Sequence, residues 1–222
     1  SMIADDGSSY GRYCVIAGTE VSCPNSPGSW YSPAGQYPSG NIISYGAFNY
    51  YAGTQQKVEQ LLITSTSIYI RTCNVGDEDV NWPECNGFGW KGTSKFKAPV
   101  DYKKIIGYGA FPLIWFDTKG NVTKQKVVQS LITRTDDGNS ESYGRYCDIS
   151  LGGRIDCGGW QGPVPIIAPD GSKDIIISYG AFSYYAGTQQ KVVQSYVADN
   201  GTDNRNSYSR TCDVGEDDVN WV

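Results

Sequence analysis

The apolar positions of this chain fall into short segments that glycine, asparagine and aspartate interrupt, and none has the spacing of a convincing amphipathic helix. Segments rich in β-branched and aromatic residues alternate in part between apolar and polar positions, as strands with one buried face do. We predict strands at 42–48, 105–111 and 175–182, with partner strands at 58–63, 69–75, 127–133 and 192–197. The turn signals between them are Asp136-Asp137-Gly138, Gly152-Gly153 and Asn200-Gly201.

Internal repetition is the strongest signal in the sequence. The string Ile-Ile-x-Tyr-Gly-Ala-Phe occurs three times, with its tyrosine at positions 45, 108 and 179. A Tyr-Gly-Arg-Tyr-Cys block occurs at 10–14 and 143–147, and an Arg-Thr-Cys block that ends in Val-Asn-Trp occurs at 71–82 and 210–221. The full period is about 134 residues, from Tyr45 to Tyr179.

These repeats predict an all-β fold of tandem, disulfide-stapled, sandwich-like or barrel-like units made of short antiparallel strands. We place one unit at residues 8–90, a variant half-repeat that connects the units at 91–140, and a second unit at 141–222. By the repeat spacing, the partner of Cys212 falls two positions beyond residue 222, so we expect the chain to be part of a longer array.

The seven cysteines follow the same period. In the first three half-repeats that contain cysteine, a second cysteine comes 9, 12 or 10 residues after the first, and the last half-repeat has Cys212 alone. We expect the local disulfides Cys14–Cys23, Cys73–Cys85 and Cys147–Cys157. Two of these segments read as hairpins with a cysteine at each end, which brings the two sulfurs within bonding distance. A staggered scheme also fits: Cys23–Cys73, Cys85–Cys147 and Cys157–Cys212. Either scheme predicts an oxidising compartment, and therefore a secreted or cell-surface protein.

Three tryptophans, Trp30, Trp90 and Trp160, each follow the second cysteine of a half-repeat. Because aromatic burial dominates small β cores, we expect these side chains to pack in the core rather than to stack on a ligand.

Composition narrows the possible functions. The chain has a net charge of −5, which argues against nucleic acid or an anionic membrane as the main partner. It has no histidine, so every catalytic arrangement that needs an imidazole is excluded. We find no nucleophile elbow, no phosphate loop and no apolar pair of carboxylates, and we expect no enzymatic activity. No apolar run approaches the roughly 20 residues that cross a bilayer.

The near-identical segments Tyr-Tyr-Ala-Gly-Thr-Gln-Gln-Lys at 50–57 and 184–191 are the first candidate binding site. Exposed tyrosines beside long polar side chains are typical of recognition surfaces. We predict that a partner contacts the residues Tyr50, Tyr51, Gln55, Gln56, Lys57, Tyr184, Tyr185, Gln189, Gln190 and Lys191. The alternative is that a recent duplication left two copies of a segment with no binding role.

Acidic loops in both Arg-Thr-Cys blocks are the second candidate site. Asp77, Asp79 and Asn81 have the one-three-five oxygen spacing of a calcium loop, which Glu216, Asp218 and Asn220 repeat. The glycine and the terminal glutamate of an EF-hand are missing, so only a looser calcium site is possible, and the alternative is a solvated turn. We expect no other cofactor.

The sequence as a whole favours a non-catalytic binding module from a long secreted or cell-surface repeat protein, a scaffold that docks a protein partner in the way cohesin-like modules do. The first alternative is a carbohydrate-binding lectin module, with or without calcium. A structural stalk or matrix repeat is the second alternative.

Overall fold

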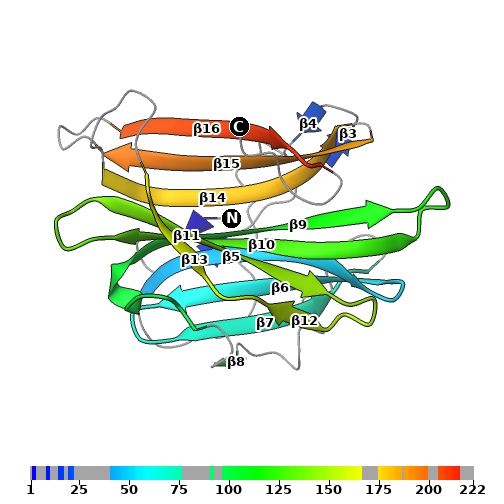
Figure 1. Ribbon diagram of the computed structural model, residues 1–222, viewed down its shortest axis with the longest axis horizontal. Coiled ribbons are helices and arrows are strands. Elements are labelled where there is room, and N and C mark those ends of the chain that lie inside the picture. Colours follow the sequence, from blue (N-terminus) through cyan, green and yellow to red (C-terminus); the bar gives the residue numbers. More distant parts are fainter. Residues whose placement is uncertain are drawn as a thin grey trace.

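The chain folds into three antiparallel β-sheets that stack as layers (Figure 1). The computed structural model describes residues 41–76, 97–166, 175–186, 188–199 and 205–215, with short strands at 2–3, 9–10, 15–17, 20–22 and 91–92. The first sheet has the order β5 (Ile42–Ala52), β6 (Gln55–Thr64), β7 (Ile68–Asn74) and β8 (Lys91–Gly92). The third has the order β14 (Ile175–Ala186), β15 (Gln189–Asp199) and β16 (Arg205–Asp213).

The second sheet lies between these two. Its strands are β9 (Ile105–Phe116), β10 (Val122–Arg134), β11 (Ser140–Ile149) and β12 (Ile155–Cys157), and β13 (Gln161–Pro165) pairs with β11 as well. The 3₁₀ turn η3 (Tyr102–Lys104) precedes β9. Two further pairs of short strands are β1 (Met2–Ile3) with β2 (Ser9–Tyr10), and β3 (Val15–Ala17) with β4 (Glu20–Ser22).

The predicted all-β class and the antiparallel pairing are confirmed, and every predicted strand overlaps an observed one. The observed Tyr-Gly-Ala-Phe strands are longer than predicted, because each continues to the turn that leads into its partner. In the first sheet that turn contains Gly53, whose φ of 64° is a conformation that glycine adopts without strain. The unit boundaries at 90/91 and 140/141 remain predictions.

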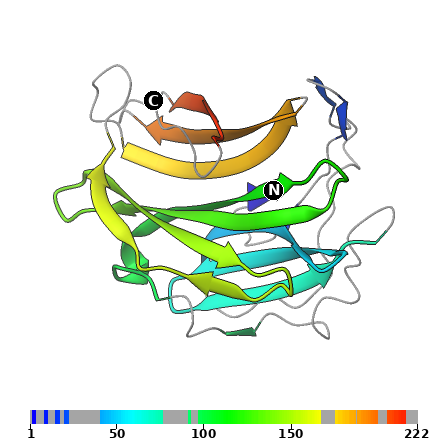
Figure 2. The same ribbon diagram turned by 45° about the vertical axis from the view of Figure 1, so that its right-hand side comes forward.

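Each sheet begins with a Tyr-Gly-Ala-Phe strand, and these three strands stack on one another. β9 packs against β5 on one side and against β14 on the other (Figure 2). Glycine permits the close approach: a Cβ on Gly46 would overlap the ring of Tyr108, and one on Gly109 would lie 2.6 Å from Cε1 of Tyr179. The tyrosine of each layer therefore fills the space above a glycine in the layer before it.

The alternation of the middle strand divides the core in two. Tyr108 and Ala110 of β9 face the first sheet, where they pack with Phe48, Leu61 and Ile63. The other face of β9 carries Phe111 and Leu113, which pack with residues of the third sheet that include Val192 and Cys212. The middle sheet is thus covered on both faces.

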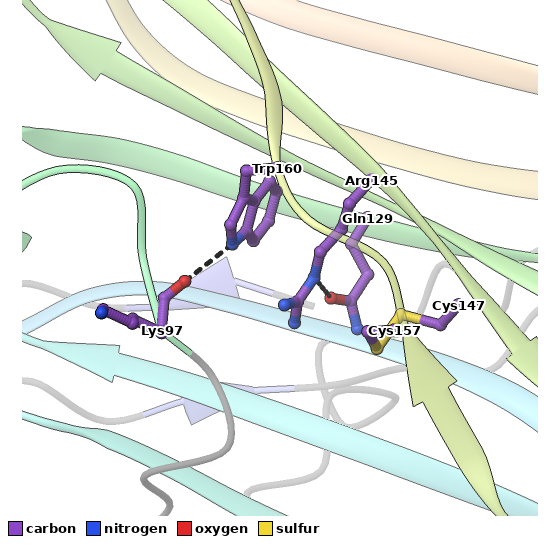
Figure 3. Close-up of a disulfide and its surroundings, with 6 residues drawn as sticks. All are labelled: Lys97, Gln129, Arg145, Cys147, Cys157 and Trp160. Atoms are coloured by element: carbon purple, nitrogen blue, oxygen red, sulfur yellow. Dashed lines mark hydrogen bonds between the residues drawn. A yellow bond between two sulfur atoms is a disulfide. The ribbon is translucent and has the colours of Figure 1, made fainter.

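One disulfide closes the hairpin of β11 and β12, between Cys147 and Cys157, which lie opposite each other in the strand register (Figure 3). This pairing confirms one local disulfide and excludes the staggered partners of both cysteines. Cys212 is buried and unbonded. Cys73 is in a disulfide, while Cys14, Cys23 and Cys85 lie outside the described residues.

Trp160 lies beside this disulfide and packs against the first core, in agreement with the structural role predicted for it. Its ring nitrogen donates to the carbonyl of Lys97 (2.8 Å), and the guanidinium of Arg145 lies 4.5 Å from the ring centre. Arg145 in turn donates to the side-chain oxygen of Gln129 (2.8 Å). Trp30 and Trp90 fall outside the described part of the chain.

Within the described residues, no helix is long and apolar enough to cross a membrane.

Candidate functional site

The interface between the first and second sheets is filled with apolar side chains, whereas the interface between the second and third sheets is not. A few positions on the strands cause this difference. The pair Gln60–Arg71, which recurs in every sheet as a glutamine opposite an arginine, serves as the reference point. Beyond it along β6 and β7 of the first sheet come the apolar cross-strand pairs Leu61–Ile70 and Ile63–Ile68. Leu61, Ile63 and Ile68 are buried, and they fill the space between the first and second sheets with apolar side chains. This interface is therefore closed.

The corresponding pairs of the second sheet are smaller and more polar. After Gln129–Arg145 come Ser130–Gly144 and Ile132–Ser142, so serine and glycine replace three of the four apolar residues found in the first sheet. A cavity of about 690 Å³ lies here, between the second and third sheets. Its volume is in the range of small-molecule binding sites in proteins.

Aromatic and polar side chains form the third-sheet wall of this cavity, which we call the cleft. Tyr196 and Tyr208 face each other across β15 and β16, with ring centres 5.1 Å apart and an interplanar angle of 28°. Beside them, Gln194 donates to the hydroxyl of Tyr179 (3.0 Å) and accepts a hydrogen bond from Arg210 (2.8 Å).

The second-sheet wall supplies hydroxyl and amide groups. Ser130 forms a hydrogen bond with the hydroxyl of Tyr179 (2.8 Å), which fixes that ring between the two walls. Ser142, Tyr146 and Gln161 also line the cleft. Aromatic rings and neutral hydrogen-bonding groups therefore both line the cleft.

The charge of the cleft is opposite to that of the chain. Arg210 carries a positive charge on its third-sheet wall, whereas the chain carries a net charge of −5; the side chain of Arg145 lies on the other face of the second sheet, beside Trp160. Burial lowers the pKa of Arg145, and it raises the pKa of the Tyr179 hydroxyl. Tyr179 is therefore neutral at physiological pH, and the positive charge on the third-sheet wall of the cleft is that of the exposed Arg210.

The predicted binding segment of the first sheet is partly engaged within the protein. Tyr50 is 5% exposed and belongs to the first core. The backbone of Tyr51 is held by Gln125 of the second sheet, whose side chain accepts from its N–H (2.9 Å) and donates to its carbonyl (2.6 Å). Gln55 donates to the carbonyl of Val75 (2.8 Å), while Gln56 and Lys57 are half-buried.

The second copy of the segment has a similar arrangement. Gln190 is buried, where it accepts from the N–H of Ile114 (3.2 Å) and donates to the carbonyl of Pro112 (3.0 Å) in the middle sheet. Gln189 donates to the carbonyl of Val214 (2.7 Å). The repeated glutamine at this position therefore joins one layer to the layer before it, a role that the sequence analysis did not identify.

The other residues of this copy lie at its surface or at the edge between the layers. Lys191 forms an ion pair with Asp213 (2.6 Å). The hydroxyl of Tyr185 donates to the carbonyl of Ile114, whereas Tyr184 lies half-buried on the far face of the third sheet. A contact of this segment with a partner stays a prediction.

The predicted calcium loops at Asp77, Asp79, Asn81, Asp218 and Asn220 lie outside the described residues. Among the residues that are described, no group of three or more histidine, cysteine or acidic side chains is placed to hold a metal ion.

The cleft itself was not predicted from the sequence. One signal for it exists, since Leu61 and Ile70 align with Ser130 and Gly144 once the Gln and Arg positions of the repeats are superposed. Small polar residues at positions that are apolar in another repeat indicate that the interface on that face of the sheet is not tightly packed. Finding the tyrosine wall opposite requires the layer order, which the repeat pattern does not contain.

Comparison with known proteins gives no relative: no family model and no curated protein matches the chain.

Proposed function

We propose that this chain is a non-catalytic binding module and that the cleft between the second and third sheets binds a carbohydrate. The observation that carries the proposal is the combination of the stacked rings of Tyr196 and Tyr208 with Gln194 and Arg210 on one wall of the cleft. Sugars present C–H faces that pack on aromatic rings and hydroxyl groups that pair with amide, hydroxyl and guanidinium groups.

The charge of the cleft favours a sugar that carries a carboxylate. Arg210 is the exposed charged group of the lining, and a planar guanidinium pairs with a carboxylate through two hydrogen bonds. Hydrolysis of a glycosidic bond needs a pair of carboxyl groups, and the described lining of the cleft contains no aspartate or glutamate. The guanidinium supports an acidic sugar as the ligand, and the lack of carboxyl groups in the described lining supports binding without catalysis.

The site of action that we propose is extracellular. The Cys147–Cys157 disulfide supports an oxidising compartment, because such bonds are rare in reducing ones. The repeated strings support a module of a longer array, in which weak sites gain strength through high effective concentration.

The test is a glycan array that contains neutral and acidic oligosaccharides, followed by calorimetry on the sugars that bind. Tyr208→Ala should weaken binding about fivefold, since removing a stacking ring costs on the order of 1 kcal/mol. Tyr69 occupies the equivalent place in the first sheet, two residues before Arg71, so Tyr69→Ala is the matched control and should bind normally.

Arg210→Gln tests the acidic sugar. It should weaken uronate binding and remove its dependence on salt, while binding of a neutral analogue stays the same. An array without hits, or equal loss from Tyr208→Ala and Tyr69→Ala, would overturn the carbohydrate proposal. Running the array with and without chelator also tests the predicted calcium loops.

Docking of a protein partner is the second candidate function. The specific observation in its favour is the far face of the third sheet, where Phe182 is 53% exposed and Ile175 and Ile177 are also exposed. Exposed apolar groups that gather on one face mark interaction surfaces. A pull-down from the secreted fraction of the source organism tests this function, and a Phe182→Asp bait, which should lose the partner, is its control.

A further inference from the structure

An arginine held by a glutamine recurs at the same place in all three sheets. The cross-strand pairs, one to a sheet, are Gln60–Arg71, Gln129–Arg145 and Gln194–Arg210. In each pair the arginine Nε donates to the side-chain oxygen of the glutamine, over 2.8 Å in the second and third sheets. This hydrogen bond orients the guanidinium, so each sheet presents a flat cationic group.

In the second sheet, an aromatic ring lies against this guanidinium. The guanidinium carbon of Arg145 is 4.5 Å from the centre of the Trp160 ring (Figure 3). Trp160 packs against the first core, and its ring nitrogen donates to the carbonyl of Lys97, which holds the indole in place. Guanidinium groups bind the faces of aromatic rings in this way. One copy of the arginine–glutamine pair therefore binds an aromatic ring within the protein itself.

The pair of the third sheet lies on the equivalent face of its sheet. Gln129 is opposite Ala110, which faces the first sheet, and Gln194 is opposite Ala181, which faces the second. The cleft therefore lies over Arg210 on the same side on which Trp160 lies over Arg145.

The three arginines differ in exposure. Arg71 and Arg145 are 5% and 7% exposed, whereas Arg210 is an exposed residue in the lining of the cleft. A ring that belongs to a ligand can therefore reach the guanidinium of Arg210. The cavity of about 690 Å³ has room for such a ring together with a sugar.

The sugar proposed for the cleft lies next to this ring position. Tyr208 and Arg210 are two residues apart on β16, so their side chains point to the same face of the sheet, roughly 7 Å apart along the strand. A sugar on the ring of Tyr208 therefore places a substituent near Arg210.

One guanidinium can serve two groups of the same ligand. In a uronide, a glycoside of a uronic acid, the carboxylate and the substituent on the anomeric carbon flank the ring oxygen and so lie on one side of the sugar. The edge of a guanidinium pairs with a carboxylate, and its face stacks on an aromatic ring. Because the Nε of Arg210 donates to Gln194, the two terminal nitrogens form the edge that meets the carboxylate.

We infer that the cleft contains a subsite for an aromatic ring on Arg210, and that its ligands are uronides whose anomeric substituent is an aryl group. The inference rests on the carbohydrate-binding function proposed above and names the ligand class. The sugar lies on Tyr208, and the aryl group takes the place on Arg210 that Trp160 takes on Arg145.

Calorimetry with three glucuronides that differ only in the anomeric substituent tests this inference. Phenyl glucuronide should bind about fivefold more tightly than cyclohexyl glucuronide, whose ring is similar in size but has no aromatic face. Methyl glucuronide has no ring to bury and should bind more weakly than both.

Arg210→Lys separates stacking from charge. The lysine keeps a positive charge for the carboxylate but removes the planar face, so the preference for phenyl over cyclohexyl should fall to about twofold or less. Arg154→Lys makes the same change at an exposed arginine outside the lining of the cleft and should keep the fivefold preference. A preference that Arg210→Lys leaves unchanged would overturn the inference.

The inference and the carbohydrate proposal fail in different ways. If the three glucuronides bind with equal affinity, the aromatic subsite is wrong and the carbohydrate proposal stands. If none of them binds, the inference is wrong, and the glycan array decides the carbohydrate proposal separately.

Discussion

Gly109 and Gly180 occupy the same place in two copies of one string, yet their surroundings differ. A Cβ on Gly109 would lie 2.6 Å from the Tyr179 ring and 3.1 Å from the Cβ of Ala181, whereas the same atom on Gly180 would meet only Ser195. We predict that Gly109→Ala lowers the free energy of unfolding by roughly 1–3 kcal/mol through overpacking. Gly180→Ala should change it by no more than about 0.5 kcal/mol.

Urea denaturation of the two variants, followed by tyrosine and tryptophan fluorescence, measures this difference. Neither glycine has a left-handed backbone conformation, so strain at the substituted residue does not contribute. Equal stability of the two variants would contradict the close stacking of β9 and β14.

The glutamine side chains that bond to the backbone of a neighbouring sheet give a second prediction about single residues. Gln125→Leu removes both hydrogen bonds to the Tyr51 backbone and leaves a part-buried N–H without that partner, which should cost about 1–3 kcal/mol. Gln56→Leu changes the same residue type at the equivalent place in the first sheet and should cost much less. Thermal unfolding at low protein concentration compares the two, and equal losses would refute the joining role.

At the level of strands, the hairpin of β11 and β12 depends on its disulfide. Replacing Cys147 and Cys157 together with alanine should lower stability by about 2–3 kcal/mol, because a short closed loop is released in the unfolded chain. Cys212→Ala removes a buried sulfur that is not bonded, so it measures the cost of lost packing alone. Calorimetry should show a clearly larger loss for the double variant.

The strands could be predicted from the sequence because their signal is local. β-branched and aromatic runs, together with the turn residues Asp136 to Gly138, are sufficient to place β9, β10 and β11. The local disulfide followed from the same hairpin pattern. The β-bulges were not predicted: β5 and β14 each carry an extra residue at Ile43 and Ile177, which shows only in the strand register.

The stacking order could not be predicted, because it depends on contacts between residues far apart in the chain. Tyr50 was expected to be part of a binding surface, and only its position beneath β9 shows that the ring is buried. Gln190 has the composition of a recognition residue, but its polar groups pair with backbone groups of β9. The same side-chain chemistry suits an interface between proteins and an interface between layers, so composition alone does not distinguish them.

The layered arrangement of the molecule predicts its response to alkaline pH. Burial between the sheets, together with the nearby Glu59, raises the pKa of the Tyr50 hydroxyl to about 12, and burial also raises the pKa of Tyr108 and Tyr179. An unfolded tyrosine loses its proton near pH 10. Between about pH 10 and 12, the unfolded chain therefore binds fewer protons than the folded one, and stability falls as pH rises.

The contribution of Tyr50 to stability is fully present below about pH 10 and is lost as pH rises through its pKa of about 12. Urea midpoints measured at about pH 9, 10 and 11 should decrease, and tyrosinate absorbance should rise in the same transition as unfolding. Tyr50→Phe cannot ionise and should show a shallower decrease over that range. If the buried tyrosines instead ionise near pH 10 while the protein stays folded, the interfaces between the layers admit water, and the tight stacking that forms the walls of the cleft is wrong.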